Sequence, residues 1–531
     1  MIFGKNEIPS FLDEVNDYLQ ENLPKTYTIT ANITNGVSAG AQEIKTGETV
    51  YVYLYNNLGY ALPTSITVAG AQYIYNNETG IITLKNATSN VSISASCPVR
   101  YSINVTITNG SYTMSQTGIT EDETATVVLT ADSGYRVSRN ITVTGADYTY
   151  DYSTFTITLS NPTGNINITT DCIVFVPIYG VEWVNDATPD TTMTRTDDAT
   201  NMTYAISNGK VASDFDNVFP YALMKRVTIQ NDYNEDNVFV YVPSMWFRIK
   251  EGNTYTGQDY FDITGIAVSS QKGEDVAGYR WVQSKPFYYG AYGASSGLNG
   301  LRSIAGVNRA ANINSSNFRG MAMSNGTGYH QRDLYSGTVL MFLWFIEFAT
   351  KYSLSVMTGV VTGHLENTGS TDTFYNETEG DNFCVSGYDT TTGQMVWHGI
   401  EDFIGNLREY EDGIYGAGSG GVQYATSDYT KYNDPSQMYQ LAFRFPANGC
   451  LIALGYDINA PLLVQPIAII NDSQFRFGFR SQVSGNNGAV SIRGSTWNGG
   501  SAGGGVASFA RYPAASYSTQ RGARLCLEYT E

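Results

Sequence analysis

The sequence predicts a mainly β protein with some helix, in which two small tandem β-sandwiches precede a larger α+β domain. A segment that alternates apolar and polar residues at period two occurs twice, and glycine and asparagine separate its strands. Beyond about residue 175 the composition changes to aromatics and glycine, and one strongly apolar run appears. We expect four parts with these bounds: residues 1–25, 26–98, 99–175 and 176–531.

The charge composition indicates which classes of partner the protein is suited to bind. Only 15% of the 531 residues are charged, against roughly 25% in ordinary domains, and the net charge is −19. An acidic chain without clustered Lys and Arg is a poor match for phosphate backbones, so no nucleic-acid partner is expected. Polarity comes instead from Asn, Ser, Thr and 40 Tyr. These residues are typical of β-sheet surfaces and of contact surfaces that bind without charge.

Residues 1–25 are predicted to form an amphipathic helix. Ser10 is the expected cap, apolar residues such as Phe11 and Val15 follow at helical spacing, and Pro24 ends the helix. Such a helix could dock onto another protein or mediate oligomerisation. A helix folded onto its own domain fits the pattern equally well.

Targeting signals are lacking in the first residues, which have no signal-peptide pattern, so synthesis in the cytoplasm is expected. The most apolar window, Val339–Phe348, contains Glu347 and is shorter than the roughly 20 residues that span a bilayer. We therefore expect no membrane insertion and predict a buried helix from Ser336 to Tyr352, capped by Ser336.

The repeat is close in sequence. "YTITANITNG" at Tyr27–Gly36 matches "YSINVTITNG" at Tyr101–Gly110, and the closing cysteines Cys97 and Cys172 lie 75 positions apart. The units resemble the Ig-like and internalin-B-type β repeats of surface adhesins and phage tail proteins. Neither contains a catalytic constellation, which favours a role in spacing and presentation.

Two strings in the last part carry specific patterns. The first, D-x-x-G-N-x-x-E-aromatic, suits a tight turn with positive φ at its glycine and asparagine, and its carboxylates could accept bonds from amides around that turn. The second, R-G-x-x-W … G-A-R-L, ends as a closing strand whose arginine points inward. Their structural residues are Asp402, Gly405, Asn406, Glu409, Arg493, Gly494 and Arg524.

In this order the strings resemble phage tail-fibre and tail-tip proteins with a C-terminal C-type-lectin fold. The similarity covers roughly residue 178 to the end. It is greatest to the branch shared with formylglycine-generating enzyme and with retroelement-diversified variable proteins such as a phage's major tropism determinant. The resemblance implies host recognition by a phage tail, a virion location, bacterial surface receptors of glycan or protein, and attachment to other tail or baseplate proteins. A homotrimer is expected by the same analogy.

Between the two ends of the second string, R-G-x-x-W and G-A-R-L, lies a glycine-rich stretch with large side chains. We expect this stretch to be a loop that holds aromatics outward. In the resembling family this region is the ligand-binding face. Flexible glycine loops with incidental aromatics are the alternative. The predicted ligand-binding residues are Trp497, Asn498, Ser501, Ser508, Phe509, Arg511, Tyr512, Ser516, Tyr517 and Thr519.

Catalysis is not expected. Formylglycine-generating enzyme needs a close cysteine pair, whereas Cys526 stands alone. A polysaccharide-degrading tail enzyme would need paired carboxylates across a groove. The candidates fall within one short string and suit structural roles equally: Glu401, Asp402, Glu409, Glu411 and Asp412. A bacterial surface adhesin is a further alternative, which the lack of a signal peptide disfavours.

Metal and cofactor signals are weak. The five cysteines show no CxxC pair, and the three histidines show no metal-ligand spacing. No cofactor is expected beyond a structural Ca²⁺ or Mg²⁺ ion, which a lectin-type loop could bind. The acidic stretches that could serve are Asp186–Asp190, Asp197–Asp198 and Asp232–Asp236.

Overall fold

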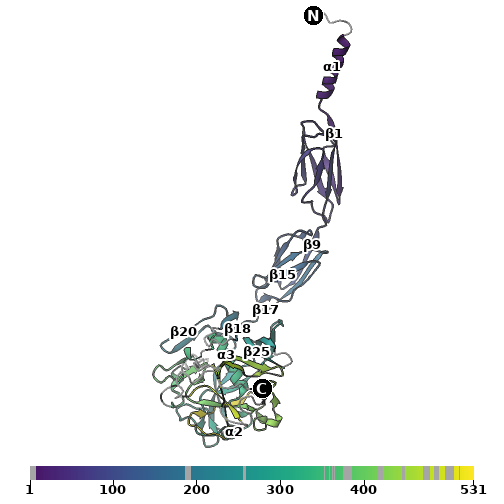
Figure 1. Ribbon diagram of the computed structural model, residues 1–531. Coiled ribbons are helices and arrows are strands. Elements are labelled where there is room, and N and C mark those ends of the chain that lie inside the picture. Colours follow the sequence, from purple (N-terminus) through teal and green to yellow (C-terminus); the bar gives the residue numbers. More distant parts are fainter. Residues whose placement is uncertain are drawn as a thin grey trace. The chain divides into compact units, whose positions relative to one another are not determined.

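The computed structural model describes residues 7–185, 193–254, 259–351, 353–357, 359–361, 363, 365–374, 386–416, 422–444, 449–470, 479–483, 489–496, 507–513 and 515–530. The chain divides into two compact units, Met1–Phe175 and Val176–Glu531. Figure 1 draws the first in purple and blue and the second mainly in teal to yellow. Strands predominate over helices, so the predicted mainly β class with some helix is confirmed. Among the described residues, no helix is both long and apolar enough to cross a bilayer.

Helix α1 spans Glu7–Asn22, so the prediction of Ser10 as its cap is wrong. Pro9 falls in the first turn, where an amide has no intrahelical acceptor and proline is tolerated. The helix ends two residues before Pro24, as the restricted backbone ahead of a proline favours. Phe11 and Tyr18 are 61% and 66% exposed.

Each repeat forms two sheets around a shared core. In the first repeat, one face of β1 (Thr26–Thr34) and β8 (Val91–Ser96) packs against β4 (Thr49–Asn56) and β7 (Ile81–Lys85) through residues such as Ile93 and Leu84. This arrangement follows from the period-two alternation, because every second side chain points to the same face of a strand. The first sheet has the order β3 (Glu43–Lys45), β1 (Thr26–Thr34), β8 (Val91–Ser96) and β5 (Thr67–Ala69), and the second has β2 (Gly36–Gly40), β4 (Thr49–Asn56), β7 (Ile81–Lys85) and β6 (Gln72–Asn76).

The second repeat has the same plan. Its first strand, β9 (Tyr101–Thr108), pairs in parallel with its last, β17 (Ile166–Val174), as β1 does with β8. One sheet has the order β11 (Gly118–Ile119), β9 (Tyr101–Thr108), β17 (Ile166–Val174) and β13 (Tyr135–Val137), with β14 (Thr142–Thr144) also on β17, and the other has β10 (Gly110–Met114), β12 (Ala125–Ala131), β16 (Thr156–Ser160) and β15 (Asp147–Asp151).

Matching positions of the two repeats make matching contacts. Asn35 and Asn109 both adopt positive φ, 59° and 55°, at the turn after the first strand. Their side-chain amides donate to the carbonyls of Cys97 and Cys172 at 3.4 and 3.3 Å. Both cysteines are buried and free.

The second unit contains a 14-stranded sheet. Its strands come from the whole of this unit, so distant segments become neighbours. The main path runs through β19 (Thr194–Asp197), β18 (Ile178–Glu182), β25 (Tyr260–Ser269), β37 (Gly449–Asp457), β39 (Phe479–Val483), β41 (Ala507–Pro513), β40 (Ala489–Arg493), β34 (Arg408–Gly416), β35 (Gln423–Ala425) and β36 (Tyr439–Gln440), and β24 (Trp246–Thr254), β26 (Tyr279–Gln283), β38 (Ala460–Ile470) and β42 (Arg521–Gly522) pair beside it.

Smaller sheets and short helices complete the unit. One sheet has the order β20 (Tyr204–Ser207), β21 (Lys210–Ser213), β31 (Ser386–Tyr388), β32 (Met395–Trp397) and β33 (Ile400–Glu401). Another has β22 (Arg226–Gln230), β23 (Asp236–Val242), β27 (Phe287–Gly290), β43 (Leu525–Glu528) and β30 (Tyr329–Gln331), and β28 (Ser295–Ser296) pairs with β29 (Leu301–Arg302). Besides α2 (Ser315–Met323), the helical turns are η1 (Asp214–Asn217), η2 (Tyr221–Leu223), η3 (Ser353–Ser355), η4 (Ser370–Phe374), η6 (Tyr429–Lys431) and η7 (Pro435–Gln437).

Helix α3 (Leu334–Phe348) is the predicted buried helix, with different ends. Its cap is Asp333, whose carboxylate accepts the Ser336 amide at 2.7 Å, so Ser336 is the third residue of the capping box and not the cap. The helix ends at Phe348, where Ala349 adopts the left-handed conformation, and not at Tyr352. Nearly every side chain of α3 is buried in the main core of this unit.

Candidate functional site

The turn of the first string brings Asp402 and Asn406 together. Gly405 and Asn406 have φ of 90° and 61°, as a tight turn requires. The Asn406 side-chain amide donates to Asp402 at 2.9 Å, and the Met395 amide donates to the same carboxylate at 3.2 Å. Arg309 adds an ion pair to Asp402 at 2.5 Å. The carboxylate therefore fixes this turn against the neighbouring strand β32.

Glu409 has a different role from the one expected. It takes its charged bonds from guanidiniums and not from amides around the turn: Arg332 Nη1 lies 2.8 Å from Oε2, and Arg524 Nε lies 2.8 Å from Oε1. Burial disfavours the charged form of Glu409, but the Arg524 and Arg332 guanidiniums outweigh burial and hold its pKa below the ordinary value. Arg524 points into the core and is fully buried.

Arg493 lies beside this pair on strand β40. Its Nε lies 2.5 Å from Oε1 of Glu411, and its Nη1 donates to the carbonyl of Gly337 in α3 at 3.2 Å. Burial lowers the pKa of Arg493 to about 10, although Glu411 opposes that change. Gly494, which follows, has a φ of 89°. The second string thus joins the large sheet to the buried helix.

The remaining acidic candidates are also buried and paired. Glu401 accepts from Arg309 at 2.8 Å and from the Thr371 hydroxyl at 2.6 Å. Burial raises the pKa of Glu401, and Arg309 opposes the rise. Asp412 accepts from Arg319 at 2.9 Å through Nε. All five carboxylates of the string are occupied by protein groups, an arrangement that suits structural support.

The predicted ligand-binding loop is in part a strand. Residues 507–513 form β41, an inner strand of the large sheet, so the expectation of a continuous loop is wrong there. β41 pairs with β40 and β39, which places Ser508, Phe509, Arg511 and Tyr512 opposite paired residues along its length. A strand can form here beside a glycine-rich segment, because Phe, Tyr and Arg are compatible with the extended backbone of a paired strand. Trp497, Asn498 and Ser501 lie outside the described residues.

After β41 the chain carries Ser516, Tyr517 and Thr519 at the surface. Tyr410 donates its hydroxyl to the Ser516 carbonyl at 2.9 Å, and Arg521 donates to the Ser516 hydroxyl at 2.5 Å. Tyr517 is 59% exposed, and its hydroxyl accepts from Asn314, the cap of α2, at 3.0 Å. These bonds hold the segment to the buried Tyr410 and to the half-buried Arg521 and Asn314.

Metal candidates differ from those expected. Asp186–Asp190 lies outside the described residues. Asp197 pairs with Arg248 at 2.5 Å, Asp198 accepts the Ile178 amide at 2.8 Å, and Asp236 accepts from Gln230 at 3.0 Å. Among the described residues, one group with three ligand atoms in reach of one another was missed: Asp216, Glu347 and His398. Its only sequence signal was a lone charged residue, Glu347, inside the most apolar window.

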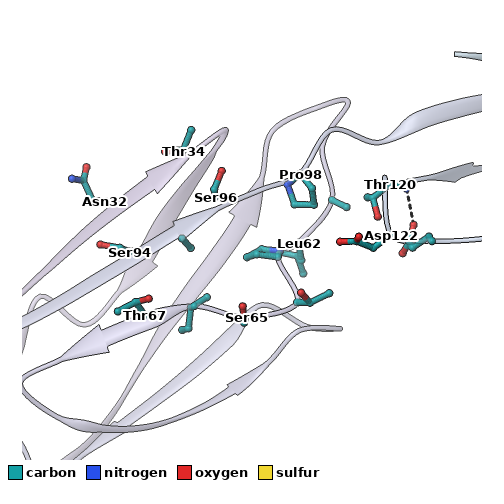
Figure 2. Close-up of a pocket in the computed structure, with 16 residues that line it drawn as sticks. Asn32, Thr34, Leu62, Ser65, Thr67, Ser94, Ser96, Pro98, Thr120 and Asp122 are labelled. Atoms are coloured by element: carbon teal, nitrogen blue, oxygen red, sulfur yellow. Dashed lines mark hydrogen bonds between the residues drawn. The ribbon is translucent and has the colours of Figure 1, made fainter. Parts of the chain in front are cut away.

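A groove of about 790 Å³ lies in the first unit (Figure 2). Hydroxyl-bearing side chains such as Thr34, Ser65 and Ser96 line it, together with Leu62 and Pro98. Asp122 and Glu123 are its acidic lining residues, and the Thr120 amide donates to the Glu123 carboxylate at 2.9 Å. The groove contains no predicted site residue.

Comparisons with known proteins identify no family for this chain. No family model matches the chain, and no curated protein matches it. Among solved structures the chain is similar to PvdO from Pseudomonas aeruginosa, with 11% identity and a TM-score of 0.25, over 57% of this chain and 99% of that one. A likeness of that size carries no argument about fold or function.

Proposed function

We propose that this protein is a phage tail receptor-binding protein that recognises a bacterial surface ligand, glycan or protein, through the C-terminal segment of its second unit. In this proposal the second unit is a C-type-lectin-like domain, the two β-sandwiches are Ig-like spacers, and α1 attaches to other tail or baseplate proteins. The protein acts in the virion as a homotrimer, and several copies supply avidity.

The observation that carries the proposal is the anchoring of the exposed segment around Tyr517. Ser516 is bonded by Tyr410 and Arg521, and Tyr517 is bonded by Asn314. A binding residue held on a rigid frame loses little conformational freedom when it meets a ligand, and tyrosine offers both apolar area and a hydroxyl.

The acidic string favours binding over hydrolysis. Glycosidases place two carboxyl groups across a scissile bond, open to substrate and water. Here Glu401, Asp402 and Glu409 are buried and paired with arginines. That arrangement supports the framework and leaves the degrading enzyme as the less supported alternative. A bacterial adhesin would use the same surface and differ in location.

The test is adsorption of virions to host cells. Replacement of Tyr517 with Ala removes the exposed ring, and replacement with Phe removes only the hydroxyl. We expect a loss of about tenfold or more for Tyr517→Ala, as for a central contact residue. The fourfold variant with Ala at 497, 509, 512 and 517 extends the test to the other predicted aromatics.

The matched control is Tyr148→Ala, which removes a tyrosine that is 43% exposed in the first unit. It should leave adsorption unchanged. Full adsorption by a folded fourfold variant would place the contact surface elsewhere. Detection of the protein on bacterial cells and not in virions would favour the adhesin. A near-copy of the final codons downstream, differing at adenines, would add retroelement diversification to the proposal.

A further inference from the structure

Three ligand-type side chains from separate elements meet inside the second unit. Asp216 lies in η1, Glu347 in α3, and His398 in the turn between β32 and β33. One donor atom from each lies within 4.8 Å of the others. The exposed fractions are 8%, 0% and 1%, so the group is shielded from solvent.

The existing bonds leave His398 between two carboxylates. Its Nε2 lies 2.9 Å from Oε2 of Glu347, and Trp397 donates to the same oxygen at 2.7 Å. Its Nδ1 lies 4.0 Å from Oδ1 of Asp216, which is too far for a hydrogen bond. The other oxygen of Asp216 accepts the Ser213 amide at 3.0 Å.

Two oxygens of the group have no partner among the described residues. They are Oδ1 of Asp216, which faces His398, and Oε1 of Glu347. A buried carboxylate oxygen without a partner is costly, and nearly all buried polar atoms in proteins are bonded. The Arg195 guanidinium lies near Glu347 and donates to its backbone carbonyl, but it makes no hydrogen bond to Oε1. The unpartnered oxygens therefore point to a missing cation.

We propose that Asp216, Glu347 and His398 hold a divalent first-row metal ion, best matched by Zn²⁺. Imidazole together with carboxylates is a common zinc donor set. With bonds near 2.1 Å, donors on one ion lie about 3.0–3.4 Å apart. One imidazole nitrogen binds a given ion, and one donor atom from each of the three residues lies within 4.8 Å of the others, so the set reaches that spacing by small side-chain movements. Ca²⁺ takes six to eight oxygens and Mg²⁺ keeps waters, so the ion expected from the sequence fits this group less well.

Such an ion would be structural. It would join η1, the C-terminal half of α3 and the β32–β33 turn, three segments far apart in the chain. This inference does not depend on the proposed receptor binding, since none of its residues belongs to the C-terminal segment.

The experiment measures metal in the full-length protein. Chelated protein is reloaded with Zn²⁺, dialysed and analysed for metal content, and its thermal unfolding is compared with and without the ion. We expect one zinc per chain and a higher Tm. Asp216→Asn and His398→Gln should weaken zinc binding by at least about tenfold.

His330→Gln is the matched control. His330 is also buried, with Asp333 and Glu528 carboxylates at 3.7 and 3.8 Å, but it lies outside the group. This variant should keep one zinc. Equal binding by all three variants would overturn the proposal, as would a wild-type chain that takes up no zinc or takes up Ca²⁺ in preference.

X-ray absorption of the zinc-loaded wild type needs no variant. One imidazole nitrogen with oxygen neighbours is expected at the ion. A sulfur neighbour would assign the zinc to thiols such as Cys97 or Cys172, which are free, and would overturn the site.

Discussion

Arg524 and Glu409 form a fully buried pair in which Nε and Nη2 of the guanidinium reach the same carboxylate oxygen, at 2.8 and 2.7 Å. Arg524 also donates to the carbonyls of Gly290 at 2.9 Å and Glu401 at 2.8 Å. One side chain from the closing string therefore connects β27, β33 and β34. The two sequence strings are therefore in direct contact through this pair.

Glu409→Gln should destabilise the second unit. The change leaves the buried Arg524 guanidinium without its counter-charge and leaves Arg332 only Glu411, at 3.5 Å, which costs about 3–5 kcal/mol. All six tryptophans lie in this unit, so tryptophan fluorescence during urea unfolding reports on it alone. Lys272→Ala breaks an exposed pair with Asp275 and should cost less than about 1 kcal/mol. Equal losses in both variants would contradict a special role for the buried pair.

The same pair predicts acid sensitivity. Because the folded-state pKa of Glu409 lies below its unfolded value, its contribution to stability is present above about pH 4.3 and is lost as the pH falls through the lowered folded pKa. The free energy of unfolding should therefore fall less between pH 5 and 3 in Glu409→Gln than in the wild type. Parallel pH curves for the two proteins would refute this assignment.

Asp333→Ala should weaken the buried helix α3. The variant loses the cap on the Ser336 amide, which costs about 1 kcal/mol, and leaves the buried Tyr432 hydroxyl without its acceptor, which costs about 1–3 kcal/mol more. Unfolding followed by tryptophan fluorescence measures the loss, since Trp344 lies in this helix. Ser336→Ala keeps the Asp333 cap and should cost less. A larger effect for Ser336→Ala would show that the cap is misassigned.

Gly36→Ala should loosen the first sandwich only. An added Cβ would lie 2.6 Å from the Tyr55 carbonyl oxygen and 2.9 Å from Cys97 Sγ, a clash that costs about 1–3 kcal/mol. Hydrogen exchange should accelerate in β4 but not in β12. Gly110→Ala, which meets the Thr130 carbonyl and Cys172 in the same way, should give the reverse pattern.

The control for both glycines is Gly164→Ala, where an added Cβ meets nothing within 4 Å. Its exchange should match the wild type in both sandwiches. Unchanged protection in Gly36→Ala would mean that the strands shift to accept the methyl group.

Local patterns were enough for the mainly β class, the duplicated segment and the buried helix. Each depends on spacing within a few residues: alternation in β4 and β12, or an unbroken apolar run in α3. The predicted helix ends were less accurate, because Ser10 and Ser336 have the residue type of a cap although neither caps its helix. The identity of the cap at Asp333 depends on a backbone conformation that its neighbours impose.

The sequence alone thus determined which residue strings matter, whereas the tertiary structure decided what each side chain meets. Arg332 reaches Glu409 across 77 positions and Arg524 across 115, and Asp216 meets His398 only because η1 packs beside the β32–β33 turn. Residues 507–513, which we expected to be a loop, form an inner strand for the same reason. The partners of a buried charge or of a strand depend on which distant segments become neighbours in the fold. The local spacing of residues contains no information about those neighbours.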